Sequence, residues 1–202
     1  MKLYFAPHTC SFSPHIVLQE LGLPYELVQV DNQTKRTADG RDFRGINPKG
    51  YVAALELENG EVLTEGAVIV QYLADLKPSA QLAPPQGSWQ RVRLQEWLSF
   101  IGSEIHAGAA PLFNQDLPQA AGAILRDKLG KRVALLETTL QRQAYLLGDQ
   151  FSVADAYLYT VLGWFKFFGI SLDRWPAIAA YASRIAARPS VRAALQAEAE
   201  AR

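Results

Sequence analysis

The order of strands and helices in the first part of the chain most restricts the fold. Residues 2–5 and 25–30 read as strands, and residues 12–21 between them have a rough apolar face and end at a glycine, as a helix does. A strand–helix–strand run this short implies two parallel strands joined by a right-handed crossover. We therefore expect a small sheet with a helix packed on it.

A hairpin and another helix complete this part. Residues 53–57 and 62–63 flank a loop that contains Asn59-Gly60, a strong signal for an antiparallel hairpin. A helix is then predicted to run from residue 64 to the proline at residue 78. The order β-α-β followed by β-β-α is thioredoxin-like, and we assign this domain to residues 1–77.

Beyond this domain the strand signals disappear. Residues 78–87 contain three prolines and read as a linker. Apolar residues then recur at helical spacing over 94–105 and 125–140, and residues 151–168 are apolar nearly all round, which is typical of a helix at the centre of a bundle. We expect an all-helical domain over residues 88–202, so the predicted fold class is α/β followed by all-α.

One short motif in the helical part has a structural explanation. Ser152-Val153-Ala154-Asp155 has the spacing of a capping box at a helix start. Loss of the Ser152 cap should cost about 1 kcal/mol of stability.

Charge and composition argue against several classes of partner. Twenty basic and twenty acidic residues give a net charge of zero, so a nucleic-acid partner is not expected. No apolar run approaches the length of a membrane span, and the N-terminus has no signal-peptide pattern. One cysteine cannot form an internal disulfide, and a free thiol fits a reducing cytoplasm. No cluster of Cys, His and acidic residues has metal-ligand spacing, so we expect a cytoplasmic protein without a metal.

The single cysteine, Cys10, is the candidate reactive residue. It stands at the start of the first predicted helix, where unpaired backbone N–H groups and the helix dipole favour a thiolate. This placement predicts a lowered thiol pKa. Ser13 occupies the position where a dithiol oxidoreductase would carry its second cysteine. An isolated cysteine is more often a small buried side chain, so both interpretations stay open.

Several motifs, taken together and in order, resemble the glutathione transferases. They are Cys10 in the early loop, residues 47–50 and 63–66 around the hairpin, His106 in the helix after the linker, and residues 151–157. The resemblance covers the whole chain and is to the bacterial beta class. It implies a thioredoxin-like domain followed by a helical domain, with glutathione as co-substrate and no other cofactor.

The resemblance also implies a glutathione site in the first domain. Cys10 would face the glutathione sulfur and could form a mixed disulfide with it. Glu65 and Gly66 would bind the γ-glutamyl end, Val52 would pair its backbone with the cysteinyl part, and Lys35 would meet the glycine carboxylate. Without the resemblance, Glu65 could be a plain first-turn acid, and Lys35 a solvated surface charge.

Three residues after the linker complete this expectation. His106 would lie near the sulfur, although a lone histidine near an apolar stripe is more often a packed, hydrogen-bonded residue. Ser103 and Glu104 would reach glutathione from the partner subunit, which implies a homodimer. Ala107 and Ser99 depart from relatives that have lysine and asparagine there, which puts ligand contacts in doubt.

The bond between Val52 and Ala53 is a further departure. The family has a cis peptide before a proline at this place, and this chain has alanine. We expect the bond to be cis nonetheless, because the hairpin and the first helix constrain the turn.

The leading hypothesis is an enzyme that adds the glutathione sulfur to small hydrophobic electrophiles, by electrostatic stabilisation of the glutathione thiolate. Aromatic residues such as Phe113, Trp164 and Phe168 could line the electrophile pocket, although most aromatics at helical spacing belong to a core. Two alternatives remain: a glutaredoxin-like disulfide reductase acting through Cys10, and a glutathione-binding or interaction protein with little turnover.

Overall fold

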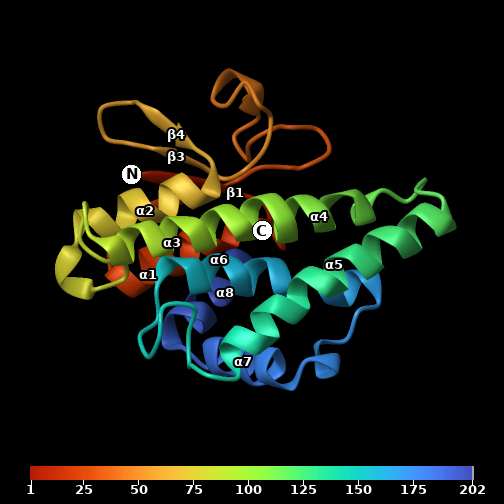
Figure 1. Ribbon diagram of the computed structural model, residues 1–202. Helices are drawn as coiled ribbons and strands as arrows, with labels where there is room; N and C mark the ends of the chain where they lie inside the picture. The colour runs from red at the N-terminus through yellow and green to blue at the C-terminus, as the bar shows by residue number, and fades with distance from the viewer. Residues whose placement is uncertain (202) are drawn as a thin grey trace. The chain divides into compact units, whose positions relative to one another are not determined.

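A four-stranded mixed sheet forms the first part of the protein, as predicted (Figure 1). Its strands are β1 (Lys2–Phe5), β2 (Glu26–Gln29), β3 (Ala54–Glu56) and β4 (Val62–Thr64). They lie in the order β2-β1-β3-β4, with β1 parallel to β2 and antiparallel to β3, and β3 antiparallel to β4. The short strand–helix–strand run thus forms the expected parallel pair, and the Asn59-Gly60 loop closes the expected hairpin.

Two helices accompany the sheet, α1 (Phe12–Leu21) and α2 (Gly66–Leu76). Gly22 ends α1 in the left-handed conformation, with φ of 60°, which glycine adopts without a steric penalty. Ile69 and Leu73 of α2 are fully buried, whereas Leu76, the last residue of the helix, is 45% exposed.

The computed structural model describes residues 1–201, and it divides the chain into two units. Unit 1 joins residues 1–83 to the C-terminal stretch from residue 186, and unit 2 spans residues 84–185. The C-terminal helix α8 (Pro189–Glu200) therefore belongs with the sheet, whereas we had expected all of residues 88–202 to form the helical domain.

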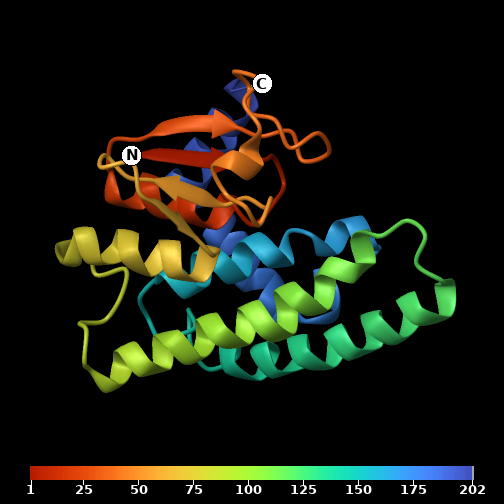
Figure 2. The ribbon, with the colours of Figure 1, turned by 90° about the horizontal axis from the view of Figure 1, so that it is seen from above.

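Polar contacts explain why α8 packs in unit 1. The buried His15 of α1 places Nδ1 2.9 Å from Oε1 of Glu198. Arg188 donates from Nε to Oε1 of Glu20, at the other end of α1, over 2.6 Å. Helix α8 contacts α1, and in Figure 2 its blue ribbon runs behind the red and orange elements of unit 1.

Unit 2 is helical, as predicted. Figure 1 shows α3, a following π-helical segment and α4 as one continuous ribbon, with α5 alongside. The elements are α3 (Trp89–Phe100), the π-helical segment (Ile101–His106), α4 (Ala107–Ala109), a 3-10 turn (Ala110–Phe113), α5 (Gln119–Leu140), α6 (Val153–Leu162), two further 3-10 turns (Phe165–Phe168 and Leu172–Arg174) and α7 (Pro176–Ala186).

Helix α6 is the buried centre of unit 2. Every residue of it except Tyr159 is buried, which confirms the interpretation of the apolar run. The predicted capping box is present at its start: Oδ2 of Asp155 accepts from the backbone N–H of Ser152 over 2.8 Å and from its hydroxyl over 2.7 Å. Oδ1 of the same carboxylate accepts from the N–H of Leu146 and the hydroxyl of Tyr181.

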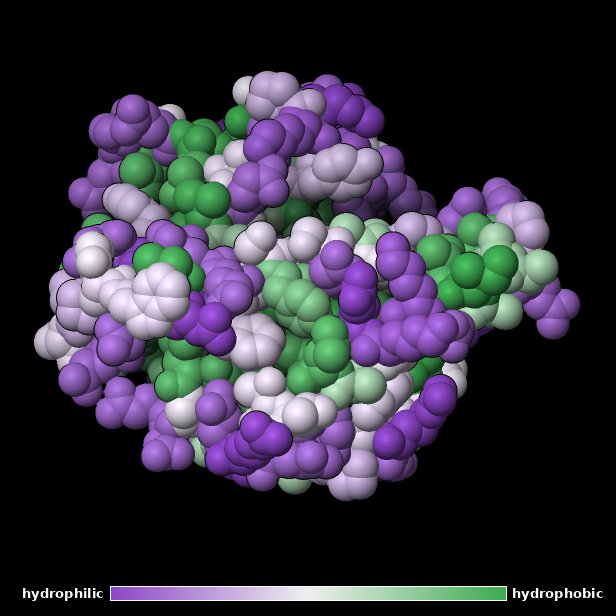
Figure 3. Space-filling model, viewed as in Figure 1, coloured by the Kyte–Doolittle hydropathy of each residue, from purple (hydrophilic) through white to green (hydrophobic). Residues whose placement is uncertain are grey.

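The surface mixes polar and apolar residues. On the face seen in Figure 3, hydrophobic residues gather in patches between hydrophilic ones, and one patch lies where α4 connects to α5. Within residues 1–201, no helix combines the length and apolar character needed to cross a bilayer. The same residues contain no group of three or more side chains placed to hold a metal ion.

Candidate functional site

Cys10 lies in the loop between β1 and α1, two residues before the helix begins. Its Sγ donates a hydrogen bond to the carbonyl oxygen of Val52 over 3.1 Å. The loop is held by its own hydroxyls: Thr9 donates to the carbonyl of Ala6 over 2.8 Å, and Ser13 donates to the carbonyl of Cys10 over 3.0 Å. The thiol is therefore held against Val52, the residue whose backbone was expected to pair with the ligand.

The predicted lowering of the Cys10 pKa is wrong. Burial raises the pKa of the Cys10 thiol to about 11, and the negative charge of Glu65 adds to this rise. The backbone amides of Cys10 and Ala53 act in the opposite direction but do not offset burial. Loss of hydration disfavours the thiolate more than the helix start favours it. In the free protein Cys10 is a neutral thiol at neutral pH.

The segment around Val52 has the expected geometry. The Val52–Ala53 peptide bond is cis, as predicted, and both side chains are buried. The loop before it is held by Asn47, whose side chain is 2% exposed. Asn47 donates from Nδ2 to the carbonyl of Tyr51 over 2.7 Å. The sequence analysis named Asn47 only within the motif of residues 47–50 and missed that it positions the chain just before Val52.

Glu65 and Gly66 mark the start of α2. Glu65 is the N-cap residue, with φ of 71°, and within residues 1–201 its side chain bonds none of the helix amides. Instead its Oε1 accepts from Nζ of Lys49 over 2.6 Å. The side chain of Glu65 is thus not a hydrogen-bonding cap, and both its expected role in ligand binding and the alternative of a plain first-turn acid stay open. A Cβ built on Gly66 would lie 3.8 Å from Oγ of Ser13, so this helix start adjoins the Cys10 loop.

Lys35 lies in the polar loop after β2, in the left-handed conformation with φ of 58°. Its Nζ donates to Oδ1 of Asn32 over 3.0 Å and lies 5.0 Å above the ring of Tyr51. Since Tyr51 directly precedes Val52, the structure brings Lys35 to the same segment as Cys10. Sequence reasoning missed Tyr51, and the signal for it was its place beside Val52.

Unit 2 holds His106 in an aromatic environment. Its Nδ1 lies 2.6 Å from the hydroxyl of Tyr157, and its ring meets Trp164 edge to face at 4.8 Å between centroids. Phe113 packs against Trp164 and against Phe168 in the same way. We call the following residues the aromatic cluster: His106, Phe113, Tyr157, Trp164, Phe167 and Phe168.

The aromatic cluster is open to solvent on one side. Phe113 is 48% and Phe167 is 52% exposed, whereas Trp164 is buried. Exposed aromatic rings supported by buried ones can stack on a flat apolar compound. Tyr157 was expected only as part of a family motif, and its hydroxyl now proves to be a partner of His106.

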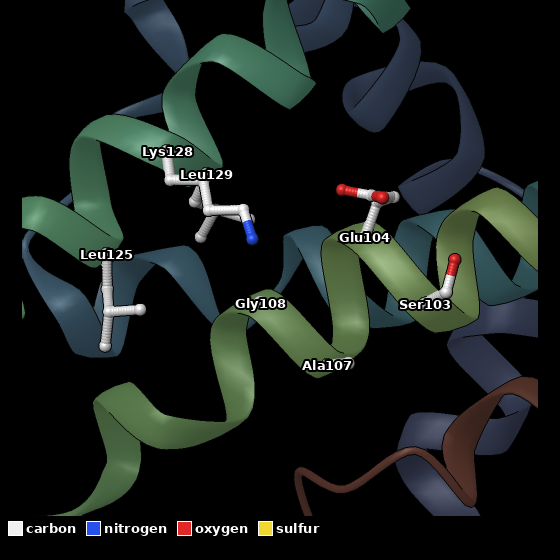
Figure 4. Close-up of a pocket in the computed structure, with 7 residues that line it drawn as sticks. All are labelled: Ser103, Glu104, Ala107, Gly108, Leu125, Lys128 and Leu129. Atoms are coloured by element: carbon white, nitrogen blue, oxygen red, sulfur yellow. The ribbon is translucent and has the colours of Figure 1, made fainter.

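Ser103 and Glu104 line a pocket of about 240 Å³ in unit 2. In Figure 4 Glu104 and Lys128 stand on facing helices, at opposite sides of this space. Ser103 donates to the carbonyl of Ser99 over 2.9 Å, and Glu104 accepts from Nε of Arg132 over 2.8 Å. The expected contact of Ser103 and Glu104 with ligand in a partner subunit stays a prediction.

The structure thus brings five of the eight expected residues together in unit 1. They are Cys10, Lys35, Val52, Glu65 and Gly66, and they meet through the loops at one end of the sheet. Together they offer a thiol, a backbone N–H and C=O pair, a carboxylate, a helix start and a lysine. This set suits a small peptide-like ligand that carries an ammonium group, carboxylates and a sulfur atom.

The chain matches two protein-family models. The model of the glutathione S-transferase N-terminal domain matches residues 9–76, and that of the C-terminal domain matches residues 100–189. A curated relative, glutathione S-transferase GstA of Escherichia coli O157:H7, is 42% identical over 198 residues, with 98% of each chain covered.

Solved structures extend this similarity to the fold. A sphingomonad glutathione S-transferase complexed with glutathione is 45% identical, with a TM-score of 0.95, over 98% of this chain and 99% of that one. A bacterial beta-class glutathione S-transferase of Sphingomonas chungbukensis is 43% identical, with a TM-score of 0.95, over 98% of each chain. Both the sequence and the backbone of this chain therefore match theirs along nearly their whole length.

Proposed function

Because the chain belongs to the glutathione S-transferase family, we propose that it is a transferase that conjugates reduced glutathione to small hydrophobic electrophiles. The observation that carries this proposal is the contact between the Cys10 thiol and the carbonyl of Val52, with Lys35 and Glu65 held by neighbouring loops. Glutathione is the co-substrate, and no further cofactor is part of the proposal.

Each residue of unit 1 has a role in binding glutathione under this proposal. Val52 pairs its backbone N–H and C=O with the cysteinyl residue, as an added strand would. Lys35 meets the glycine carboxylate, while the carboxylate of Glu65 binds the γ-glutamyl ammonium and the N–H of Gly66 binds its carboxylate. These contacts place the glutathione sulfur beside Cys10.

The chemical step is a nucleophilic attack by the glutathione sulfur. A carbon–sulfur bond forms, the leaving group departs with its electron pair, and the thiol proton of glutathione passes to solvent. Cys10 is protonated at neutral pH, because burial raises its pKa to about 11. Cys10 is therefore not a competing nucleophile, and its S–H group donates to the carbonyl of Val52.

Under this proposal the electrophile binds at the aromatic cluster. Phe113 and Phe167 present exposed rings, and His106 offers a polar group held by Tyr157. Substitution His106→Ala should raise KM for the electrophile and leave KM for glutathione unchanged. A rise confined to the glutathione KM would contradict this role.

A homodimer completes the proposed enzyme, with Ser103 and Glu104 of one chain reaching glutathione bound to the other. Glutathione affinity should then fall on dilution below the dimer dissociation constant, and a monomer that binds glutathione tightly would contradict it. A cytoplasmic location, inferred from the free thiol, is part of the same proposal.

Two assays of Cys10→Ala separate the proposed reaction from its alternatives. Conjugation of glutathione to a chlorinated aromatic should persist in this variant, because backbone donors also stabilise the thiolate, whereas glutathione-dependent disulfide reduction should disappear. Prolonged treatment of the native protein with oxidised glutathione at alkaline pH, where the Cys10 thiolate forms, should add one glutathione, at Cys10 alone, as measured by mass spectrometry. Native protein that lacks conjugation but reduces disulfides would favour the glutaredoxin-like alternative, and a lack of both would favour a binding protein.

A further inference from the structure

An ion pair joins the loop before Val52 to the start of α2. Nζ of Lys49 lies 2.6 Å from Oε1 of Glu65 and donates to Oγ1 of Thr64 over 2.9 Å. Glu65 is the residue proposed to bind the ammonium group of glutathione. In the free protein, therefore, a primary ammonium group of this chain already occupies that carboxylate.

The backbone on which Lys49 stands is held by a buried side chain. Oδ1 of Asn47 accepts from the N–H of Lys49 over 3.1 Å, and the N–H of Gly50 donates to the carbonyl of Asn47 over 2.8 Å. The side chain of Lys49 is 55% exposed. The loop backbone is thus held in place, and the long side chain of Lys49 brings its ammonium group to Glu65.

The backbone of Glu65 presents its carboxylate to a cation. The φ of 71° is in the left-handed region, which a residue with a side chain seldom adopts. Among the described residues, the carboxylate bonds no amide of α2, and it is 63% exposed. Exposed ion pairs contribute little to stability, so one ammonium group can replace another on Glu65 at small cost.

We propose that Lys49 fills the cation site on Glu65 in the free protein and that the α-ammonium group of the ligand displaces it. Lys49 then competes with the ligand for the carboxylate of Glu65, and this lowers the affinity that a ligand gains from a free ammonium group. The inference rests on the proposed function, since glutathione is the ligand that brings this ammonium group. Lys49 acts through Glu65 and is a positioning residue.

Binding measurements with two ligands test the exchange. Glutathione and glutathione acetylated on its α-amino group are titrated into the native protein, Lys49→Met, Glu65→Gln and the double variant. The ratio of the two affinities should rise in Lys49→Met, by up to roughly fivefold, the contribution of an exposed ion pair. The acetylated ligand has one more negative charge, so the lost positive charge of Lys49 weakens its binding more and by itself raises the ratio, which the Glu65→Gln background measures separately.

A matched control separates exchange from general electrostatics. Lys131 is an exposed lysine paired with Asp127 in unit 2, so Lys131→Met removes the same charge elsewhere and should leave the ratio unchanged. In the Glu65→Gln background, Lys49→Met should raise the ratio less than in the native protein, because only the general charge effect remains once the contested carboxylate is gone. Where the acetylated compound binds too weakly to titrate, the double-mutant cycle between Lys49 and Glu65 with glutathione alone gives the same coupling.

The two possible failures are distinguishable. A ratio that stays constant or falls in Lys49→Met, or a cycle without coupling, overturns the exchange while glutathione binding by the native protein stands. Native protein that does not bind glutathione overturns the proposed function itself, and the exchange with it.

Discussion

The thiol of Cys10 and the carbonyl oxygen of Val52, 42 residues apart in the chain, are joined by a hydrogen bond of 3.1 Å. Val52 is also the residue proposed to pair its backbone with glutathione. A carbonyl oxygen has two lone pairs, so it can accept from the thiol and from a ligand amide together. The contact therefore holds the Cys10 thiol beside the backbone of Val52 before the ligand binds.

Cys10 should react slowly at neutral pH. We expect the rate of its alkylation by iodoacetamide to rise with pH up to about 11, because the thiolate is the nucleophile and burial holds the thiol pKa there. Glu65→Gln should move the midpoint to lower pH, since the charge of Glu65 raises this pKa. The unfolded chain serves as the control, with a midpoint at about 8.5, and a native plateau near pH 8 would contradict the prediction.

The same thiol should make the protein less stable in alkali. The folded state holds the thiol proton more tightly, so from about pH 8.5 to about pH 11 the unfolded chain binds fewer protons and stability falls as pH rises. Cys10→Ala should reduce this fall in urea unfolding measured at pH 8 and pH 10.5. An equal fall in both proteins would show that other groups cause it.

Asp155 should matter far more to stability than its capping partner. Its buried carboxylate accepts from Ser152, Leu146 and Tyr181, and each buried donor left unpaired costs about 1–3 kcal/mol. We expect Asp155→Ala to lower the free energy of unfolding by about 3 kcal/mol or more, against about 1 kcal/mol for Ser152→Ala. Denaturant unfolding of both variants checks the order, and equal losses would contradict it.

Tyr51 should tune the affinity for glutathione through Lys35. A cation–π contact at an exposed site contributes about 0.5–1 kcal/mol, so Tyr51→Leu should weaken glutathione binding roughly twofold to fivefold. Tyr51→Phe keeps the ring and should bind as the native protein does. In the Lys35→Met background, Tyr51→Leu should have no further effect, and an undiminished effect there would exclude Lys35 as the intermediary.

Glu198 should anchor the C-terminal helix. Loss of its carboxylate leaves Nδ1 of the buried His15 without this partner, which should cost about 1–3 kcal/mol in Glu198→Ala. Glu200, exposed on the same helix, is the matched control, and its substitution by alanine should change stability by less than about 0.5 kcal/mol. Equal losses in urea unfolding would show that the bond to His15 does not matter.

Periodicity and turn chemistry predicted most of the fold. Apolar residues at helical spacing, the glycine that ends α1 and the Asn59-Gly60 loop are local signals, and local geometry determined those elements. The return of α8 to unit 1 was not predictable in this way, because an amphipathic helix shows which face is apolar but not which surface covers it. The polar partners of α8, Glu20 and His15, lie far away in the sequence.

The same distinction between local signals and contacts of distant segments applies to the candidate site. Cys10 was found from its residue type and its place at a helix start, and Glu65 and Lys35 from the resemblance to the family; the structure places all three at one end of the sheet. The direction of the Cys10 pKa was predicted wrongly, because a helix start is visible in the sequence and burial is not. The pair of Lys49 with Glu65 joins two segments whose approach depends on the hairpin between them.

The packing of α8 on α1 has a consequence for synthesis. Residues 1–83 are synthesised well before α8, so the α8-binding face of α1 stays uncovered until α8 has been made. A fragment that stops at residue 83 would keep that face uncovered permanently. Unit 1 is therefore completed only after all of unit 2 has been made, and loss of α8 should act at the proposed glutathione site.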